Sequence, residues 1–282
     1  MTTDSSYERD ILAWRTQRRA RLTASDGWLS LIGRFELPEG VSRVGSDQSC
    51  EVLLPAAAPP QLGVLVRGGT RVTFTPAQGV ATGVQRARQQ RTDAINTAVE
   101  LVTDAQGEPD RVAYGSLSIE IMQRTHSFAV RVRDTQSTTC SEFKGIPYFP
   151  IRPEWRIHAR LVPYEPPKRI DLLYESGDPE PYHSPGAAVF EWQGVEYRLD
   201  PVFDGNRPRL YIVFGDLTNR DDSYGAGRFL YAPLPRDGRV LLDFNQAFNP
   251  PCAFTPYAVC PLPPPQNRLA LRIEAGERRT AA

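Results

Sequence analysis

Residues 187–200, AAVFEWQGVEYRLD, carry the pattern that decides the fold. Apolar and polar side chains alternate on both sides of Gln193-Gly194, and a glycine in a short connection permits the positive φ that hairpin turns require. The stretch therefore predicts a β-hairpin. The same two-residue period recurs at 72–74, 117–121, 128–132, 157–161, 170–174, 210–214, 229–231, 240–244 and 269–273. Short strands in such number indicate a sandwich or barrel.

Residues 5–24 have a helical period instead. Ser5 and Glu8 fit a capping box, in which each side chain satisfies a backbone donor at the helix start. One face of this helix carries Tyr7, Ile11, Trp14 and Leu22. We therefore expect a mainly β protein with an N-terminal helix followed by two strand-rich halves, each sandwich- or barrel-like.

A concentration of proline and aromatic residues at 145–155 suggests a boundary between the halves. We expect residues 1–150 to form the helix plus a β unit. Residues 151–282 are expected to form a C-terminal β-barrel or sandwich unit, covered by a proline-rich wrap.

The composition argues against several classes of protein. The chain has 33 basic and 33 acidic residues, so it lacks the basic surplus typical of nucleic-acid binders. No apolar run approaches the roughly 18 residues that a membrane helix needs. The N-terminal MTTDSSYERD is polar, so we expect no signal peptide and a cytoplasmic protein. The cysteines are then expected to be thiols; they are Cys50, Cys140, Cys252 and Cys260.

Residues 43–55, RVGSDQSCEVLLP, place a tight polar turn between two β-like stretches. This pattern resembles the opening of a forkhead-associated domain, a β-sandwich that binds phosphothreonine. The likeness implies a degenerate sandwich in the first half and an adaptor that binds a protein partner through this turn. The supporting Ser-x-x-His of that family has no match in PAAAPPQLGVLV, which follows.

Residues 215–231, GDLTNRDDSYGAGRFLY, form a second candidate segment. The stretch is long for a simple loop, and long loops are often functional. It lacks the Lys-Ser or Lys-Thr of a phosphate-binding P-loop. Asp216 and Arg228 lie at its two ends, so they are expected to face each other across a strand pair, as part of a site or as a simple ion pair.

Residues 243–268, DFNQAFNPPCAFTPYAVCPLPPPQNR, are the most unusual stretch. Prolines alternate with large apolar groups, which a disordered linker does not normally carry. We expect an ordered, extended wrap over a β surface. Its polar side chains have two open interpretations: they line a pocket, or they satisfy backbone groups that prolines and turns leave unpaired.

This stretch, extended to Leu269, resembles the bacterial family DUF1684, a domain of unknown function. Further likeness lies in SYGAGRFLYAPLP upstream, IEAGE downstream and KGIPYFPIRPEWRIHA at 144–159. It also extends to HSPG at 183–186, to the VGSD turn and to GWLSLIGRF at 27–35. The resemblance implies membership and supplies no activity.

The sequence thus predicts a C-terminal pocket for a polar or anionic small molecule. The expected ligand-binding residues are Asp216, Tyr224, Arg228, Asp243, Asn245, Asn249, Cys252, Tyr257, Cys260, Asn267 and Arg268. The alternatives are a hydrolase-like enzyme using Cys252 or an aspartate in the same pocket, and the adaptor. Cys252 and Cys260 do not have the spacing of a zinc knuckle, so we expect no metal and assign no cofactor.

Overall fold

A computed structural model describes residues 2–87, 91–125, 127–175, 177 and 179–280, and it divides the chain into two compact units. One unit is continuous, from Leu22 to Phe143. The other combines the chain up to Arg21 with the chain from Lys144 onward. The N-terminal helix thus groups with the C-terminal strands, whereas the boundary expected at 150 assigned it to the first half. A helix carries no sequence signal for which distant sheet it will contact.

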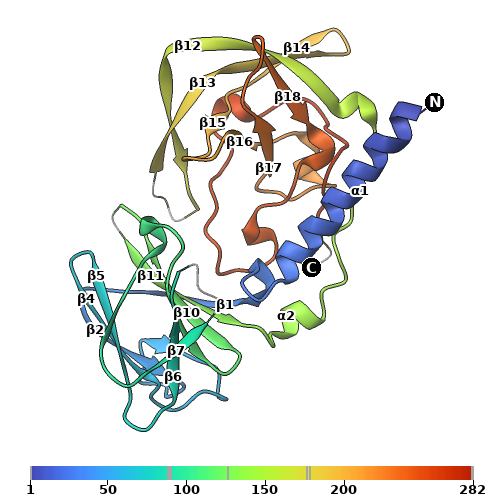
Figure 1. Ribbon diagram of the computed structural model, residues 1–282. Coiled ribbons are helices and arrows are strands. Elements are labelled where there is room, and N and C mark those ends of the chain that lie inside the picture. Colours follow the sequence, from blue (N-terminus) through green and yellow to red (C-terminus); the bar gives the residue numbers. More distant parts are fainter. Residues whose placement is uncertain (1, 88–90, 126, 176, 178, 281–282) are drawn as a thin grey trace. The chain divides into compact units, whose positions relative to one another are not determined.

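The mainly β class with an N-terminal helix is confirmed (Figure 1). Helix α1 spans Thr2–Thr23, and Ile11 on its apolar face is fully buried. Because α1 begins before Ser5, that residue lies inside the helix and the predicted capping box is wrong. Within the described residues, no helix combines the length and the apolar character needed to cross a bilayer.

Residues 22–143 form two sheets around one core. The orders are β1-β11-β10-β9-β6-β7 and β3-β2-β4-β5-β8. The strands are β1 (Leu31–Glu36), β2 (Gly40–Gly45), β3 (Val52–Leu53), β4 (Gly63–Gly68), β5 (Arg71–Pro76), β6 (Thr82–Gln85), β7 (Thr92–Ile95), β8 (Val99–Leu101), β9 (Arg111–Tyr114), β10 (Leu117–Gln123) and β11 (Phe128–Asp134). Phe74 of one sheet and Ile119 of the other share a hydrophobic cluster, so the sheets pack face to face as a sandwich. The forkhead-associated likeness stays a prediction.

The other unit contains two further sheets, with the orders β14-β13-β12-β18 and β15-β16-β17. The strands are β12 (Arg156–Leu173), β13 (Pro179–Trp192), β14 (Val195–Leu199), β15 (Val202–Phe203), β16 (Arg209–Phe214), β17 (Arg228–Pro233) and β18 (Arg239–Asp243). The hairpin at 187–200 is confirmed: β13 and β14 pair antiparallel, and Gln193 and Gly194 both have positive φ. Both sheets contribute side chains to one core, including Phe190 and Phe214.

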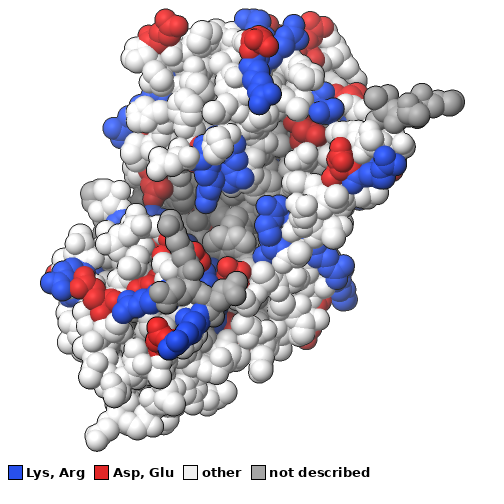
Figure 2. Space-filling view, viewed as in Figure 1, with Lys and Arg blue, Asp and Glu red and all other residues white. Residues whose placement is uncertain are grey.

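Short helical turns connect these strands. They are η1 (Trp28–Ser30), η2 (Asp104–Gln106) and α2 (Thr138–Ser141) in the first β unit, and η3 (Pro153–Trp155), η4 (Leu217–Arg220), η5 (Phe244–Gln246), η6 (Pro251–Ala253) and η7 (Pro265–Asn267) in the second. The last four lie within residues 215–231 and 243–268, the segments that the sequence singled out. On the face drawn in Figure 2, basic and acidic side chains alternate in small groups.

Residues 244–280 form an ordered wrap, as expected, but they contain no β-strand. The strand predicted at 269–273 is therefore wrong. Leu269 and Ile273 are nonetheless buried, and they join the core of the C-terminal unit. Their backbone pairs irregularly: the amide of Leu269 donates to Gly215, and that of Leu217 donates to Leu271. When side chains are alternately buried and exposed, the sequence shows the same two-residue period as a β-strand. That period arises even where the backbone forms no continuous ladder of hydrogen bonds.

Candidate functional site

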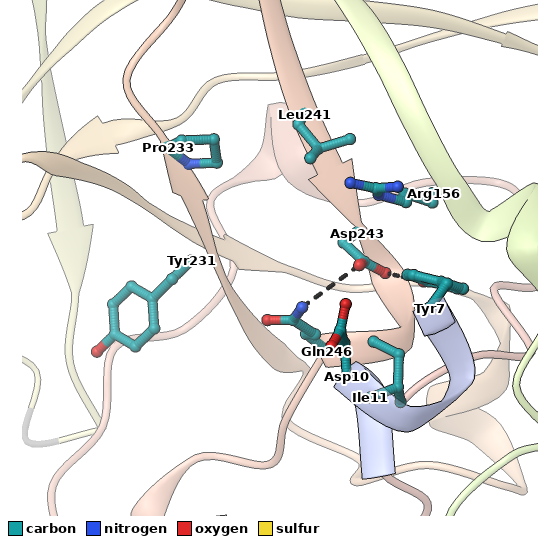
Figure 3. Close-up of a pocket in the computed structure, with 9 residues that line it drawn as sticks. All are labelled: Tyr7, Asp10, Ile11, Arg156, Tyr231, Pro233, Leu241, Asp243 and Gln246. Carbon is teal, nitrogen blue, oxygen red and sulfur yellow. Dashed lines mark hydrogen bonds between the residues drawn. The ribbon is translucent and has the colours of Figure 1, made fainter. Parts of the chain in front are cut away.

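A cavity of about 160 Å³ lies between α1 and strands β17 and β18 (Figure 3). It belongs entirely to the unit that contains α1 and the C-terminal strands. Its volume is close to that of an engineered protein cavity of about 150 Å³ that binds benzene, so it suits a ligand of that size. The lining residues are Tyr7, Asp10, Ile11, Arg156, Tyr231, Pro233, Leu241, Asp243 and Gln246.

Asp243, the last residue of β18, supplies a nearly buried carboxylate to this cavity. The Tyr7 hydroxyl donates to its Oδ1 at 2.7 Å, and the backbone amide of Asn245 donates to the same oxygen at 3.2 Å. Gln246 Nε2 lies 3.3 Å from Oδ2. Burial raises the pKa of the Asp243 carboxyl above its ordinary value, although the hydrogen bond from Tyr7 lowers it.

The rim of the cavity adds charges of both signs. Asp10 projects from α1, and Figure 3 shows its carboxylate and that of Asp243 facing the same space. Arg156 is the register partner of Asp243 across the β12–β18 pair, and its guanidinium lies 5.2 Å from the centroid of the Tyr7 ring. Two carboxylates therefore face one guanidinium.

Of the residues expected to bind a ligand, only Asp243 lines this cavity. Arg228 and Asp216 form a fully buried ion pair of 2.5 Å, which the sequence offered as the simpler of two interpretations. The guanidinium also donates to the carbonyls of Ile273 and Ala275 at 2.8 and 2.5 Å. This pair anchors the C-terminal wrap onto β17.

The three asparagines hold backbone groups, as the structural interpretation predicted. Asn267 accepts from the amide of Asp200 at 2.7 Å and donates to the carbonyls of Asp200 and Val213. Asn249 donates to the carbonyl of Arg278. Asn245 donates to the carbonyl of Arg152 and to the hydroxyl of Tyr7. Asn245 thus supports the cavity from behind through Tyr7.

The cysteines form a separate cluster. The amide of Cys252 lies 3.3 Å from Sγ of Cys260, and the Tyr224 side chain hydrogen bonds to Cys252. Tyr257 and Arg268 are exposed on the wrap. Glu175 is a charged neighbour of Cys252, and the hydrolase alternative used this cysteine or an aspartate. That alternative stays a prediction.

The turn at 43–55 uses its polar groups internally. Ser46 donates its hydroxyl to the carbonyl of Ala58 at 2.8 Å, and Arg43 pairs with Glu51 at 2.8 Å. Gly45 is packed against the carbonyl of Pro60, where a Cβ would meet that oxygen at 2.1 Å. These contacts explain the residue types of the turn without a partner protein. The adaptor alternative remains a prediction.

Comparison with known proteins gives a family match for most of the C-terminal part of the chain. Residues 141–278 match the family described as "Protein of unknown function (DUF1684)". The chain belongs to this family. A solution NMR structure of an uncharacterized protein of Haloarcula marismortui is 32% identical, over 49% of this chain and 78% of that one, with a TM-score of 0.41. No curated protein matches.

The DUF1684 match begins at residue 141, so the likeness expected at 27–35 and in the VGSD turn lies outside it. It includes β12, β17, β18 and the wrap up to residue 278, and therefore all the cavity residues except those of α1. Nothing in the family description names a ligand or a reaction.

Sequence reasoning missed most of the cavity of this DUF1684 chain. Tyr7 was expected on the apolar face of α1. Its hydroxyl was the one feature of the sequence that could have indicated a polar partner for this face. Asp10, Arg156 and Gln246 carried no distinguishing pattern. Among the described residues, no group of three His, Cys, Asp or Glu side chains is arranged to hold a metal ion.

Proposed function

We propose that this unit binds a small polar molecule carrying an ammonium group, in the cavity beside Asp243. The observation that supports this is the Asp243 carboxylate, which is nearly buried and lines the cavity. Among the described residues, no side-chain cation forms an ion pair with it. A buried carboxylate is costly unless a cation or several hydrogen bonds compensate it, and a bound ammonium would complete that compensation.

The charges of the rim define the ligand further. Asp10 adds a second carboxylate on one side, and Arg156 offers a guanidinium that suits a carboxylate group. A small zwitterion, with its ammonium on Asp243 and its carboxylate on Arg156, satisfies both signs. This arrangement favours a cationic or zwitterionic ligand over the anionic ligand that was one of the expectations from the sequence. The volume of about 160 Å³ suits a compound the size of a small amino acid.

Three probes of similar size separate the possibilities: alanine, ethanolamine and propionate. Backbone amide shifts of the ¹⁵N-labelled protein, titrated with each probe, give both the affinity and the location. We expect alanine to bind more tightly than ethanolamine, with shifts at Asp243 and Gln246. Propionate is expected to be the weakest. Tighter binding of propionate than of ethanolamine, or no shift near the cavity with any probe, would overturn the proposal.

Two variants test the roles of the charges. Asp243→Asn removes the carboxylate and is expected to weaken the binding of both amines by at least about tenfold, because one lost charged hydrogen bond costs about 1.5–3 kcal/mol. Asp171→Asn, on an exposed position of β12, is the matched control. Arg156→Ala, at the exposed rim, is expected to weaken alanine while leaving ethanolamine unchanged. If Asp243→Asn fails to fold, the Arg156→Ala result still decides the orientation.

A further inference from the structure

The second site lies in the proline-rich wrap, where two thiols meet away from the cavity residues. The backbone amide of Cys252 donates to Sγ of Cys260 at 3.3 Å. Both cysteines are free. A disulfide needs the sulfurs to approach to about 2.05 Å, and the amide–sulfur hydrogen bond already holds the Cys260 sulfur against the backbone that carries the Cys252 side chain.

Two independent anchors hold the thiols together. Cys252 lies in η6, where the amides of Ala253 and Phe254 donate to the carbonyls of Pro250 and Pro251. Cys260 is fixed from the other side, because its carbonyl accepts from the amide of Glu175 just beyond β12. The anchors come from different parts of the fold, so the contact between the Cys252 backbone and the Cys260 sulfur is built into the structure.

The two thiols differ in environment. Cys252 is partly exposed, whereas Cys260 is 2% exposed. Hydrogen bonds from Cys260 and Tyr224 lower the pKa of the Cys252 thiol below its ordinary value, despite burial and the nearby Glu175. The pKa of Cys260 is raised by its hydrogen bond to Cys252 and by burial, which outweigh the backbone amide that faces its sulfur. Cys252 is therefore the more accessible thiol of the pair and the one whose pKa is lowered.

We propose that Cys252 and Cys260 form a reversible disulfide on reaction with a hydroperoxide, with Cys252 as the attacking thiol and Cys260 as the resolving thiol. Redox-sensing cysteines generally combine an accessible low-pKa thiol with an adjacent resolving thiol, which is the arrangement in this wrap. The site is separate from the cavity, and it does not depend on ligand binding there.

The chemistry proceeds in two balanced steps. The Cys252 thiolate attacks the outer oxygen of the hydroperoxide; an S–O bond forms, the O–O bond breaks, and the leaving alkoxide or hydroxide takes a proton from solvent. The Cys260 thiol then attacks the Cys252 sulfur; an S–S bond forms, the S–O bond breaks, and water leaves with the thiol proton. The peroxide is reduced by two electrons, and the two thiols are oxidised. A dithiol reverses the change by thiol–disulfide exchange.

The test begins with the wild-type chain, so that it does not depend on any variant folding. Purified reduced protein is treated with hydrogen peroxide for increasing times, then alkylated, digested and examined by peptide mass spectrometry. We expect one cross-linked species in which Cys252 is joined to Cys260, about 2 Da lighter than its reduced and unalkylated form because two hydrogens are lost. Dithiothreitol should restore both thiols.

Cys50 and Cys140 are internal controls in the same sample, because both are partly exposed free thiols. Burial raises the pKa of Cys50, the reverse of the shift at Cys252. We expect Cys252 to be lost at least about tenfold faster than Cys50. Equal rates at Cys50 and Cys252, or oxidation without the cross-link, would overturn the proposal.

Two variants assign the roles. In Cys260→Ala the oxidation should stop at a sulfenic acid on Cys252, detected as a dimedone adduct. In Cys252→Ser, Cys260 should stay reduced at peroxide exposures that fully convert the wild-type protein. Oxidation of Cys260 at the wild-type rate in Cys252→Ser would contradict the assignment. Circular dichroism of both variants verifies folding, and the wild-type results stand if either fails.

Discussion

The guanidinium of Arg228 lies 2.5 Å from the carboxylate of Asp216, and neither side chain has any exposure to solvent. The same carboxylate accepts the amide of Thr218 at 2.7 Å, so it also caps η4. One buried pair therefore joins the end of β16, the start of β17 and the C-terminal wrap.

Replacing Arg228 with alanine is expected to lower the free energy of unfolding by about 3–5 kcal/mol, because it leaves the Asp216 carboxylate buried without a cation. Arg160→Ala is the control, since Arg160 is largely exposed and lies 3.8 Å from Glu196; it should change stability by less than about 1 kcal/mol. Urea denaturation of both variants measures the difference. Similar midpoints would show that the buried pair is not needed.

Arg18 makes a second such contact. Its Nε donates to Glu277 at 2.8 Å and its Nη2 to the carbonyl of Asn249 at 2.9 Å. Arg18→Ala should cost about 3–5 kcal/mol and increase amide hydrogen exchange in α1, since the helix loses its link to the wrap. Arg9→Ala, on an exposed position of the same helix, should leave exchange unchanged. Equal exchange in the two variants would contradict the role of Arg18.

Gly227 is required by both backbone angle and space. Its φ is 103°, and a Cβ there would lie 2.5 Å from Cγ of Pro263 and 2.7 Å from the carbonyl oxygen of Phe214. Gly227→Ala is expected to destabilise the protein by about 2–4 kcal/mol through strain and overpacking. At Gly225 the nearest atom is 3.8 Å away, so Gly225→Ala should be tolerated. Thermal unfolding of the pair decides whether the glycines differ in this way.

Tyr7→Phe tests the link between α1 and Asp243. Because the hydrogen bond from Tyr7 lowers the pKa of Asp243, its loss should raise that pKa further, as followed by ¹³C NMR titration of the carboxyl. The folded pKa already exceeds the unfolded value, so this group's stabilising contribution is present below the unfolded pKa and is lost as pH rises through the folded one. In Tyr7→Phe the loss of stability with rising pH should be larger and should extend to higher pH. If the pKa of Asp243 is the same in Tyr7→Phe as in the wild-type protein, the hydrogen bond from Tyr7 does not lower it.

Tyr224→Phe tests the environment of Cys252. Its hydrogen bond lowers the pKa of the thiol, so the variant should shift the pH profile of Cys252 alkylation upward. Less thiolate is then present at neutral pH, and alkylation should slow by roughly two- to tenfold. The profile of Cys50 in the same sample should not move. A change in both profiles would indicate a general effect on folding rather than on the thiol.

The sequence predicted features that depend on near neighbours. The hairpin at Gln193-Gly194 followed from turn chemistry, and the approach of Asp216 to Arg228 followed from their places at the two ends of one segment. The buried asparagines were also anticipated as one of two interpretations, because prolines and turns leave backbone groups to satisfy. The absence of a strand at 269–273 was not anticipated, since burial on one side produces the same alternation without a ladder.

The cavity depends on relationships that no local pattern contains. Tyr7 and Asp243 are 236 positions apart, and they meet because α1 docks on the strands that follow the inserted unit. Arg156 reaches the same place only through the register of the β12–β18 pair. In the wrap, Asn249 and Asn267 donate to backbone carbonyls, and Arg228 is paired with Asp216. The pocket expected at the wrap stays a prediction.

The contact between Arg18 and Glu277 spans 259 positions, and it sets an order on folding during synthesis. Residues 22–143 contain all the strands of their own two sheets, so this unit can fold as soon as that stretch has left the ribosome. Helix α1 is made first but must wait until residue 277 has been added before its buried arginine finds its carboxylate. Until then its apolar face is exposed, and that interval is when the nascent chain is most open to chaperone binding and to aggregation.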